Sequence, residues 1–112
     1  MVVINLISID ELQNLLAKKE FNPYISIDNP DKVLLHLIEE LGELARGLRK
    51  KDLTNAEEEL GDVQILLCFF AESIGESLES CTLDKLRKNL RTKRFIPTGK
   101  ALEKLEKLLL YE

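Results

Sequence analysis

The sequence predicts an all-α protein, an antiparallel bundle of four to five helices completed by dimerisation. Apolar residues make up 45% and charged residues 32% of the chain, with only five glycines and three prolines, which suits a helix-rich fold. Apolar side chains recur at helical spacing, and no segment shows the alternation typical of a strand. At 112 residues the chain is expected to form one domain, residues 1–112, whose small core needs help from another subunit.

The first helix is predicted to begin after Ser8 and to run to about Lys19. Ser8 and Glu11 have the spacing of a capping box, in which a hydroxyl and a carboxylate satisfy free N–H groups at the helix start. A loop is expected over Phe21–Pro30, since each of its two prolines biases the preceding residue away from helical geometry.

The second and third helices are predicted to form a hairpin. A proline suits the first position of the second helix, which is expected to have Asp28 or Asn29 as its cap and to extend to about Lys51. A second capping box, Thr54-Asn55-Ala56-Glu57, is expected to open the third helix, which ends near Gly75. The apolar stripes expected to form the core are Leu34, Leu37, Ile38, Leu41, Leu44, Ala45 and Leu48 in the second helix, and Ala56, Leu60, Val63, Leu67, Phe70 and Ile74 in the third.

A fourth helix is predicted over about residues 77–94 and a fifth over about residues 100–111, with Pro97-Thr98-Gly99 breaking the chain between them. The fifth helix carries Leu102, Leu105, Leu108 and Leu109 at helical spacing, and these leucines are expected to add to a subunit interface. The apolar run Ile65–Ala71 in the third helix predicts burial on several sides, which also fits a subunit interface.

The composition argues against several classes of protein. A formal net charge of −4 argues against stable nucleic-acid binding. The longest apolar run is far shorter than the ~20 residues that a membrane span requires. Val2–Ile7 lacks a preceding basic segment and does not fit a signal peptide. Cys68 and Cys81 give no disulfide framework and are expected to be reduced, buried thiols, so the protein is expected to be cytoplasmic.

Two near-copies of one five-residue pattern carry most of the functional information. Glu39-Glu40-Leu41-Gly42-Glu43 lies in the second helix, and Glu58-Glu59-Leu60-Gly61-Asp62 follows in the third, 19 residues later. Each copy places two carboxylates three residues apart, Glu40 with Glu43 and Glu59 with Asp62. The two pairs are symmetric about Lys51, where the hairpin is expected to turn, so folding should bring them to the same height.

Glu59 departs furthest from an ordinary helix pattern, because it projects within the apolar stripe of the third helix. An ionised carboxylate there costs several kcal/mol unless it is salt-bridged or bound to a cation, the alternative being that it is protonated. A single ExxE motif usually lies on a solvated face, whereas two copies at the same height favour a metal site. Clustered carboxylates without a nearby cysteine favour a hard cation, Mg²⁺ or alternatively Mn²⁺.

His36, the only histidine, is predicted on the same flank as Glu40 and Glu43. It could be an outer ligand, a phosphate contact or a purely structural side chain. A carboxylate-bridged di-iron site is excluded because the helices carry no Glu-x-x-His motif. No Ser or Cys is placed convincingly beside a histidine, so the acids indicate metal binding rather than nucleophilic catalysis.

Residues 81–100 are strongly basic, with seven Lys or Arg residues against one acid, Asp84. Lys85, Lys88, Arg91 and Arg94 follow one another at intervals of three, so one side of the fourth helix could meet phosphate oxygens. A solvated charged face is the plain alternative. An acidic metal site together with a basic helix suggests a polyphosphate substrate.

In this order and spacing, the motifs resemble those of the MazG-like all-α nucleoside triphosphate pyrophosphohydrolases. That family carries EExxE, then ExxD, then a helix with a lysine, an asparagine and further basic residues. The corresponding elements here, within about residues 30–96, are Glu39–Glu43, Glu59–Asp62, Lys85, Asn89 and the stretch 91–95.

The resemblance implies hydrolysis of a nucleoside triphosphate to the monophosphate and pyrophosphate, by water attack at the α-phosphorus, with Mg²⁺ and in a homodimer or homotetramer. It also implies residue roles. Glu40, Glu43, Glu59 and Asp62 would be metal ligands, Glu39 would orient or deprotonate the water, and Lys85, Asn89, and Arg91 or Arg94 would contact the substrate, with Lys93 as an alternative to the two arginines.

Two other functions fit the same motifs. Phosphoribosyl-ATP pyrophosphohydrolase shares the pattern of acidic helices, and a substrate panel would separate the two enzymes. A non-catalytic helical module for oligomerisation or nucleotide sensing would keep the bundle without turnover. Retention of all four predicted ligand acids argues against the module.

Overall fold

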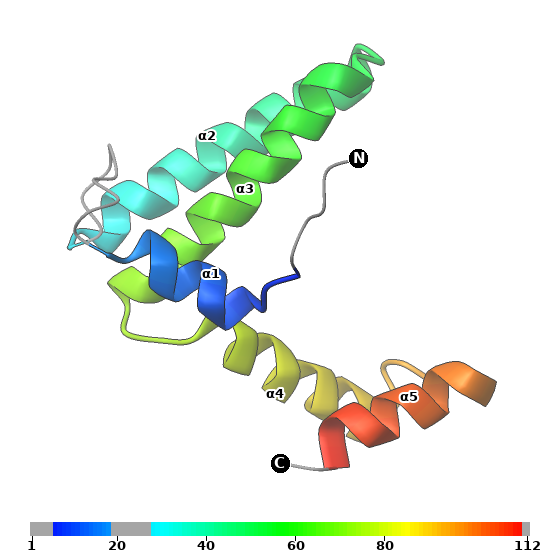
Figure 1. The fold of residues 1–112 in the computed structure, drawn as a ribbon. Coiled ribbons are helices and arrows are strands. Elements are labelled where there is room, and N and C mark those ends of the chain that lie inside the picture. Colours follow the sequence, from blue (N-terminus) through cyan, green and yellow to red (C-terminus); the bar gives the residue numbers. More distant parts are fainter. Residues whose placement is uncertain (1–5, 19–27, 111–112) are drawn as a thin grey trace. The chain divides into compact units, whose positions relative to one another are not determined.

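The computed structural model is all-helical over the residues it describes, 6–18 and 28–110, which confirms the predicted fold class (Figure 1). The helices are α1 (Ile9–Leu16), α2 (Pro30–Arg49), α3 (Leu53–Ser73), α4 (Leu78–Arg91) and α5 (Gly99–Leu110). Most of the predicted loop over Phe21–Pro30 lies outside the described residues. The first helix ends at Leu16, earlier than the predicted Lys19, because the Ala17 and Lys18 N–H groups close it by donating to the Gln13 and Leu15 carbonyls, respectively. The chain divides into two compact units, Met1–Leu78 and Glu79–Glu112, and a single domain over residues 1–112 stays a prediction.

Side-chain caps fix the starts of the first three helices. Ser8 Oγ accepts from the Glu11 N–H at 3.0 Å, and Glu11 Oε1 accepts from the Ser8 N–H at 3.4 Å, so the first capping box is confirmed. Asn29 caps α2, its Oδ1 accepting from the Lys32 N–H. The second predicted capping box is wrong: the cap of α3 is Asp52, whose Oδ1 accepts from the Asn55 N–H at 3.1 Å, so the helix begins before Thr54.

In the first unit, α3 packs against both α1 and α2 (Figure 1). The core contains Leu16 of α1, Val33 and Leu37 of α2, and Val63, Leu66, Cys68 and Phe69 of α3. The apolar run Ile65–Ala71 is therefore buried on more than one side, as predicted, and α1 supplies part of the cover within the same chain. Both cysteines are free, as expected, but Cys81 is exposed rather than buried.

The predicted apolar stripes of α2 and α3 are only partly correct. Leu37 and Val63 lie in the core, and Leu44, Leu67 and Phe70 pack against it. In contrast, six residues of the stripes are each more than 40% exposed: Leu34, Ile38, Leu41, Leu48, Leu60 and Ile74. On α2 the face toward the core follows Val33, Leu37, Leu44 and Gly47 instead. A second apolar stripe therefore runs beside the predicted one on α2, and this second stripe is the buried one. On both helices the buried face contains an acid, since Glu40 on α2 and Glu59 on α3 are half-buried.

A buried glutamine joins α1 to the end of α3 and the start of α4. The Gln13 side chain is 4% exposed, and its Nε2 donates to Glu72 Oε2 at 3.1 Å and to the Glu76 carbonyl at 2.7 Å. Its Oε1 accepts from the N–H of Leu78, the first residue of α4, at 2.8 Å. Gln13 therefore satisfies three polar groups where the chain turns from α3 into α4.

The second unit consists of most of α4 together with α5. The helix α4 ends at Arg91, three residues earlier than predicted, and α5 covers nearly the predicted range. Lys93 follows α4 with a left-handed φ of 59°, and the Arg94 N–H donates to the Asn89 carbonyl at 2.8 Å, which closes the helix end. None of the helices in the described part of the chain is long and apolar enough to cross a membrane.

Candidate metal centre

The turn between α2 and α3 sets the register of the two acidic motifs. Gly47 is buried on the last turns of α2, where a Cβ atom would lie 3.1 Å from Asn55 Nδ2 and 3.4 Å from the Ala56 nitrogen. The missing side chain thus lets the end of α2 approach the start of α3 closely. Lys51 has φ 57°, and the Asp52 N–H donates to the Gly47 carbonyl at 2.9 Å, which closes the turn.

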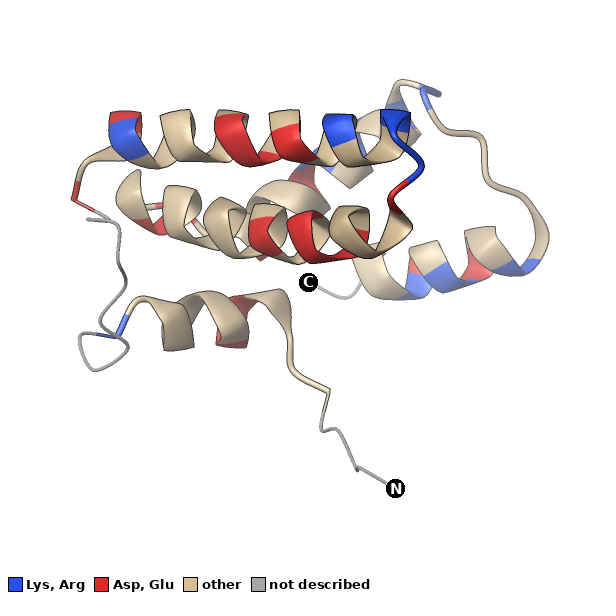
Figure 2. Ribbon diagram, turned by 90° about the horizontal axis from the view of Figure 1, so that it is seen from above, with Lys and Arg blue, Asp and Glu red and all other residues tan. Residues whose placement is uncertain are grey.

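This register brings three acids together, as Figure 2 shows for the acidic bands on the neighbouring helices α2 and α3. Among the described residues, one oxygen each of Glu40, Glu59 and Asp62 lie within 4.8 Å of one another. Glu40 and Glu59 are half-buried and Asp62 is exposed. The cluster therefore opens toward solvent on the side of Asp62, so an ion could enter from water.

The surroundings of Glu59 favour its neutral form when no cation is present. A side-chain hydrogen bond with Glu40, burial, and the negative charges around it raise the pKa of Glu59 from 4.5 to about 7, in that order of importance. The negative charges are those of Glu40, Asp62 and Glu43. Within the described part of the chain, Glu59 Oε2 is buried without a hydrogen-bond partner. Both observations indicate a carboxylate that a bound cation would stabilise.

The raised pKa of Glu59 predicts how the stability of the metal-free protein depends on pH. Because the folded state holds this proton more tightly than the unfolded chain, the free energy of unfolding should fall as pH rises from about 4.5 to about 7. Urea unfolding in EDTA at pH 5 and pH 8 measures this fall. In Glu59→Gln the fall should be smaller, and an identical fall in both proteins would show that other groups cause it.

The donor set fits a hard divalent cation. Three carboxylates offer oxygen atoms only, and Mg²⁺ and Mn²⁺ prefer such ligands. A bound cation would supply a partner for the buried Glu59 oxygen and would offset the repulsion among the acids. Glu40, Glu59 and Asp62 are therefore the residues that would hold it.

The other predicted site residues of α2 lie around this cluster. Glu43 Oε1 accepts from Arg46 Nη1 at 2.9 Å, and its side chain is 43% exposed, so Glu43 would have to exchange this partner to bind a cation. His36 Nε2 lies 3.4 Å from Glu40 Oε1, which puts the histidine behind a candidate ligand. Glu39 is exposed on α2 next to Glu40 in sequence.

The predicted substrate contacts belong to the second compact unit. Lys85 and Arg91 are exposed on α4, Asn89 is half-buried there, and Arg94 is exposed just beyond the helix. Their encounter with the acidic cluster stays a prediction. The units divide the charge of the chain: residues 1–78 hold seven basic and fifteen acidic residues, and residues 79–112 hold nine basic and five acidic ones.

The sequence interpretation missed two features that build this centre. The predicted stripe gives no role to Gly47, although it continues the Val33, Leu37 and Leu44 spacing and so shares the face of Glu40. The predicted stripe also leaves out Glu40, which meets Glu59 and Asp62 of α3 in the cluster. The signal for both was the second apolar stripe, which contains an acid and a glycine.

The comparisons with known proteins agree with the motifs. The family model for the MazG nucleotide pyrophosphohydrolase domain matches residues 28–93, more than half of the chain. The matched region begins two residues before α2 and ends just beyond α4, so it includes the acidic cluster and the whole of the basic helix α4. No curated protein and no solved structure gives a significant match.

Proposed function

Because the chain belongs to the MazG nucleotide pyrophosphohydrolase domain family, we propose that it hydrolyses a nucleoside triphosphate, ribo- or deoxyribo-, to the monophosphate and pyrophosphate. The observation that carries this proposal is the cluster of Glu40, Glu59 and Asp62, in which one buried oxygen of Glu59 has no hydrogen-bond partner among the described residues. We expect this cytoplasmic enzyme to require Mg²⁺, with Mn²⁺ as a substitute.

In the proposed reaction, water attacks the α-phosphorus and the bond from that phosphorus to the α,β-bridging oxygen breaks, so pyrophosphate leaves. Glu39, which is exposed and precedes Glu40 in the sequence, would orient the water and accept its proton. Glu40, Glu59 and Asp62 would hold the cation, and Glu43 would join them on releasing Arg46. Mg²⁺, when bound, supplies positive charge that stabilises the charge developing on the phosphate oxygens.

The direct experiment is an assay of pyrophosphate release over a panel of NTPs, dNTPs and phosphoribosyl-ATP, with and without Mg²⁺. Release from one or more triphosphates only with Mg²⁺ supports the proposal. Turnover of phosphoribosyl-ATP alone would assign the sister activity instead. Nucleotide binding without any release would favour a non-catalytic sensing module.

Magnesium is expected to raise the melting temperature of the protein, because a ligand that binds only the folded state stabilises it. The shift at millimolar Mg²⁺ should be larger at pH 8 than at pH 6, since binding must displace the proton held by Glu59. Differential scanning fluorimetry measures both shifts, with NaCl of equal ionic strength as the control. No shift at pH 8, with or without nucleotide, would count against the site.

Lys85→Ala is expected to weaken nucleotide binding about tenfold, because one charge-assisted contact to phosphate is lost. The melting temperature should barely change, since Lys85 is exposed on α4. Titration calorimetry with a slowly hydrolysed triphosphate analogue measures the affinity, and Lys107→Ala on α5 removes an equal charge as the control. An equal loss of affinity in both variants would show that the overall positive charge, and not a specific contact of Lys85, supports nucleotide binding.

We also propose that the chain assembles into a homodimer or homotetramer. The stripe of α2 that faces away from the core, with Leu34, Ile38, Leu41 and Leu48, is more than 40% exposed at each position. Such a stripe on a monomer is typical of a subunit interface. Sedimentation velocity tests the assembly, and replacing Ile38 and Leu41 by glutamate should shift it to monomer.

A further inference from the structure

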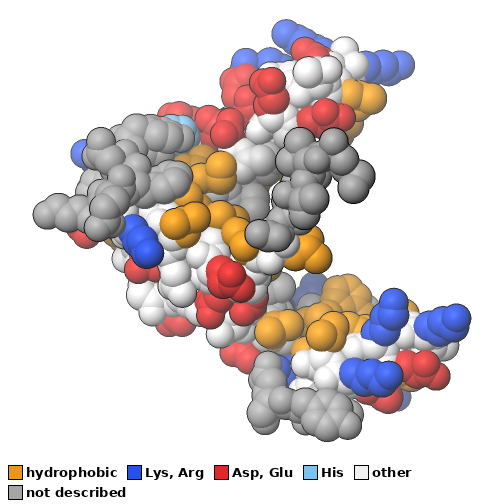
Figure 3. Space-filling view, viewed as in Figure 1, with side chains coloured by type: hydrophobic (Ala, Val, Ile, Leu, Met, Phe, Trp, Pro, Cys, Tyr) orange, Lys and Arg blue, Asp and Glu red, His pale blue; other side chains and the backbone are white. Residues whose placement is uncertain are grey.

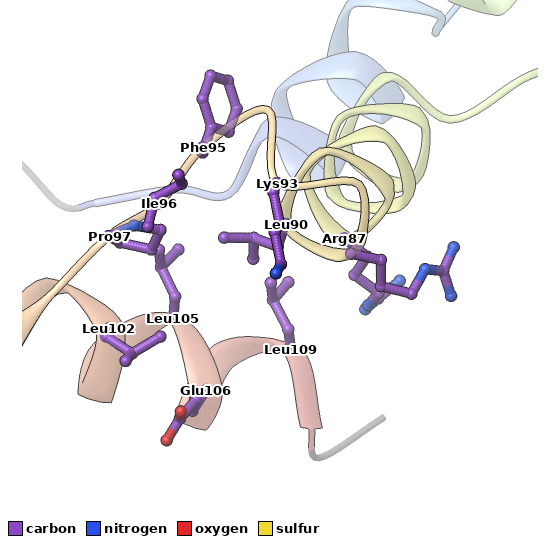
Figure 4. A pocket seen from close by; sticks show the side chains of 11 residues that line it. Arg87, Leu90, Lys93, Phe95, Ile96, Pro97, Leu102, Leu105, Glu106 and Leu109 are labelled. Atoms are coloured by element: carbon purple, nitrogen blue, oxygen red, sulfur yellow. The ribbon is translucent and has the colours of Figure 1, made fainter.

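The second unit contains an apolar groove. The proposed hydrolysis gives a role to basic residues at its rim but none to its apolar wall. The groove lies between the end of α4, residues 93–97 and α5, and its volume is about 580 Å³ (Figure 4). This volume falls within the ~300–1,000 Å³ typical of small-molecule sites. All the lining residues lie between Arg87 and Leu109, so the groove is complete within this unit.

Most of the groove wall is apolar. Leu90 comes from α4, and Leu102, Leu105 and Leu109 come from α5, where they extend over about two helical turns, ~10 Å. Phe95 and Ile96 line the groove while remaining 50% and 76% exposed, and Figure 3 shows apolar side chains beside basic ones on the surface of this unit. A ligand with an apolar body could therefore bury these exposed apolar side chains.

The charged groups of the groove are mostly basic. Arg87, Arg91 and Lys93 line it, against one acid, Glu106, whose side chain points away from the groove in Figure 4. Arg87 Nη1 donates to Asp84 Oδ1 at 2.8 Å and its side chain is only 21% exposed, whereas Arg91 and Lys93 are exposed, so these two are the cations most accessible to a ligand. The Lys93 side chain runs from the end of α4 toward Leu109, so its ammonium group stands against apolar walls.

The backbone holds Lys93 in a conformation that lysine does not favour. Its φ of 59° is left-handed, where a residue with a Cβ atom is less stable than glycine, yet the bond from the Arg94 N–H to the Asn89 carbonyl closes the helix end there. Glycine would suit the fold better at this position. The lysine therefore adds a charge to the groove at some cost to the helix end.

From the apolar walls, the volume and the two cations, we propose that this groove binds an amphipathic anion, a carboxylate with a linear aliphatic body. The body would lie along Leu102, Leu105 and Leu109, and the head group would meet Lys93 and Arg91. Apolar burial supplies most of the affinity in such a site, and the charge-assisted contact fixes the orientation. Binding needs neither Mg²⁺ nor a nucleotide, so it can be measured without the proposed hydrolysis, although Arg91 and Lys93 are also predicted contacts of the nucleotide.

The test is a titration of the full chain with decanoate, at concentrations below those at which decanoate forms micelles. Calorimetry measures the affinity, and a thermal-shift assay measures the change in melting temperature. Saturable binding and a higher melting temperature are expected. Decyltrimethylammonium, which has an aliphatic chain one carbon longer and the opposite charge, should bind at least tenfold more weakly. Butanoate should bind at least ~100-fold more weakly because it buries fewer methylene groups. Equal affinity for the anion and the cation would overturn the proposal.

Lys93→Gly separates binding from folding. It should weaken decanoate binding about tenfold while the melting temperature of the free protein stays equal or rises, because glycine suits φ 59°. Lys104→Ala removes an equal charge from α5 outside the groove lining and should keep the affinity within twofold. Unchanged affinity in Lys93→Gly, or an equal loss in Lys104→Ala, would contradict the assignment. Dissociation of an oligomer by decanoate would instead identify a second copy of the chain as the occupant.

Discussion

Replacing Glu59 with glutamine is expected to lower pyrophosphate release by at least ~100-fold, because groups that merely support a metal ligand already contribute 10–100-fold. Glutamine has nearly the same shape, but it removes one negative charge from the three carboxylates that lie within 4.8 Å of one another. Its amide nitrogen is also a donor and cannot bind a cation. A coupled assay of pyrophosphate release, run with saturating Mg²⁺, measures the loss.

Stability measurements distinguish this loss of function from misfolding. In EDTA at pH 8 the Glu59→Gln variant should be at least as stable as the parent protein, since an amide at this position does not repel Glu40 and Asp62. The shift of melting temperature by Mg²⁺ should disappear in the same variant. A variant that is inactive and also strongly destabilised without metal would indicate a structural role for the carboxylate.

The matched control is Glu58→Gln, one residue earlier on α3. Glu58 is exposed and is not one of the three clustered carboxylates, although it completes the second copy of the motif. Its replacement should leave pyrophosphate release within about twofold of the parent. Equal losses in Glu58→Gln and Glu59→Gln would mean that the overall negative charge of α3, rather than one ligand, supports activity.

The acidic cluster could be predicted from the sequence because a carboxylate in an apolar stripe must be protonated, salt-bridged or bound to a cation. The position of Glu59 in such a stripe is that signal, and the structure half-buries Glu59 and leaves its Oε2 without a partner among the described residues. The matched height of the two motifs follows from helical periodicity and the position of the turn. Periodicity alone did not show that Glu43 is bound to Arg46, because that contact depends on side-chain rotamers.

The core could be predicted less well, for a reason that lies in the helices themselves. On α2 both Leu34 with Ile38 and Val33 with Leu37 make continuous apolar stripes, and a helical wheel does not show which stripe meets α3. Gly47 selects the stripe that faces α3, because the close approach of the two helices at the turn fixes the rotation of α2 about its axis. The stripe left exposed is the face proposed for a partner subunit.

The Gln13 junction illustrates a second limit. A glutamine on a short helix predicts an exposed side chain, and nothing local indicates that Gln13 contacts Glu72, Glu76 and Leu78 more than fifty residues away. Such contacts arise only after the turn between α3 and α4 has folded against α1. The sequence does not show that Gln13 lies close in space to residues 72–78, so this contact is known only from the structure.

Replacing Gln13 with leucine is expected to destabilise the protein by about 3 kcal/mol, because the side chain is 4% exposed and its loss leaves polar groups without partners. These groups are the Glu76 carbonyl at 2.7 Å, the Leu78 N–H at 2.8 Å and the Glu72 carboxylate at 3.1 Å. Leucine keeps nearly the same volume, so the cost reports on hydrogen bonding rather than on a cavity. Urea unfolding monitored by circular dichroism measures it.

The control is Gln64→Leu, the same substitution at an exposed position of α3, which should change the free energy of unfolding by no more than ~0.5 kcal/mol. Since Gln13 accepts from the first N–H of α4, its loss should also fray the start of that helix, and hydrogen exchange at Leu78 should accelerate more than exchange at Leu66 in the core. Exchange that accelerates equally at both residues would show that Gln13 stabilises the first unit as a whole and does not specifically hold the start of the basic helix.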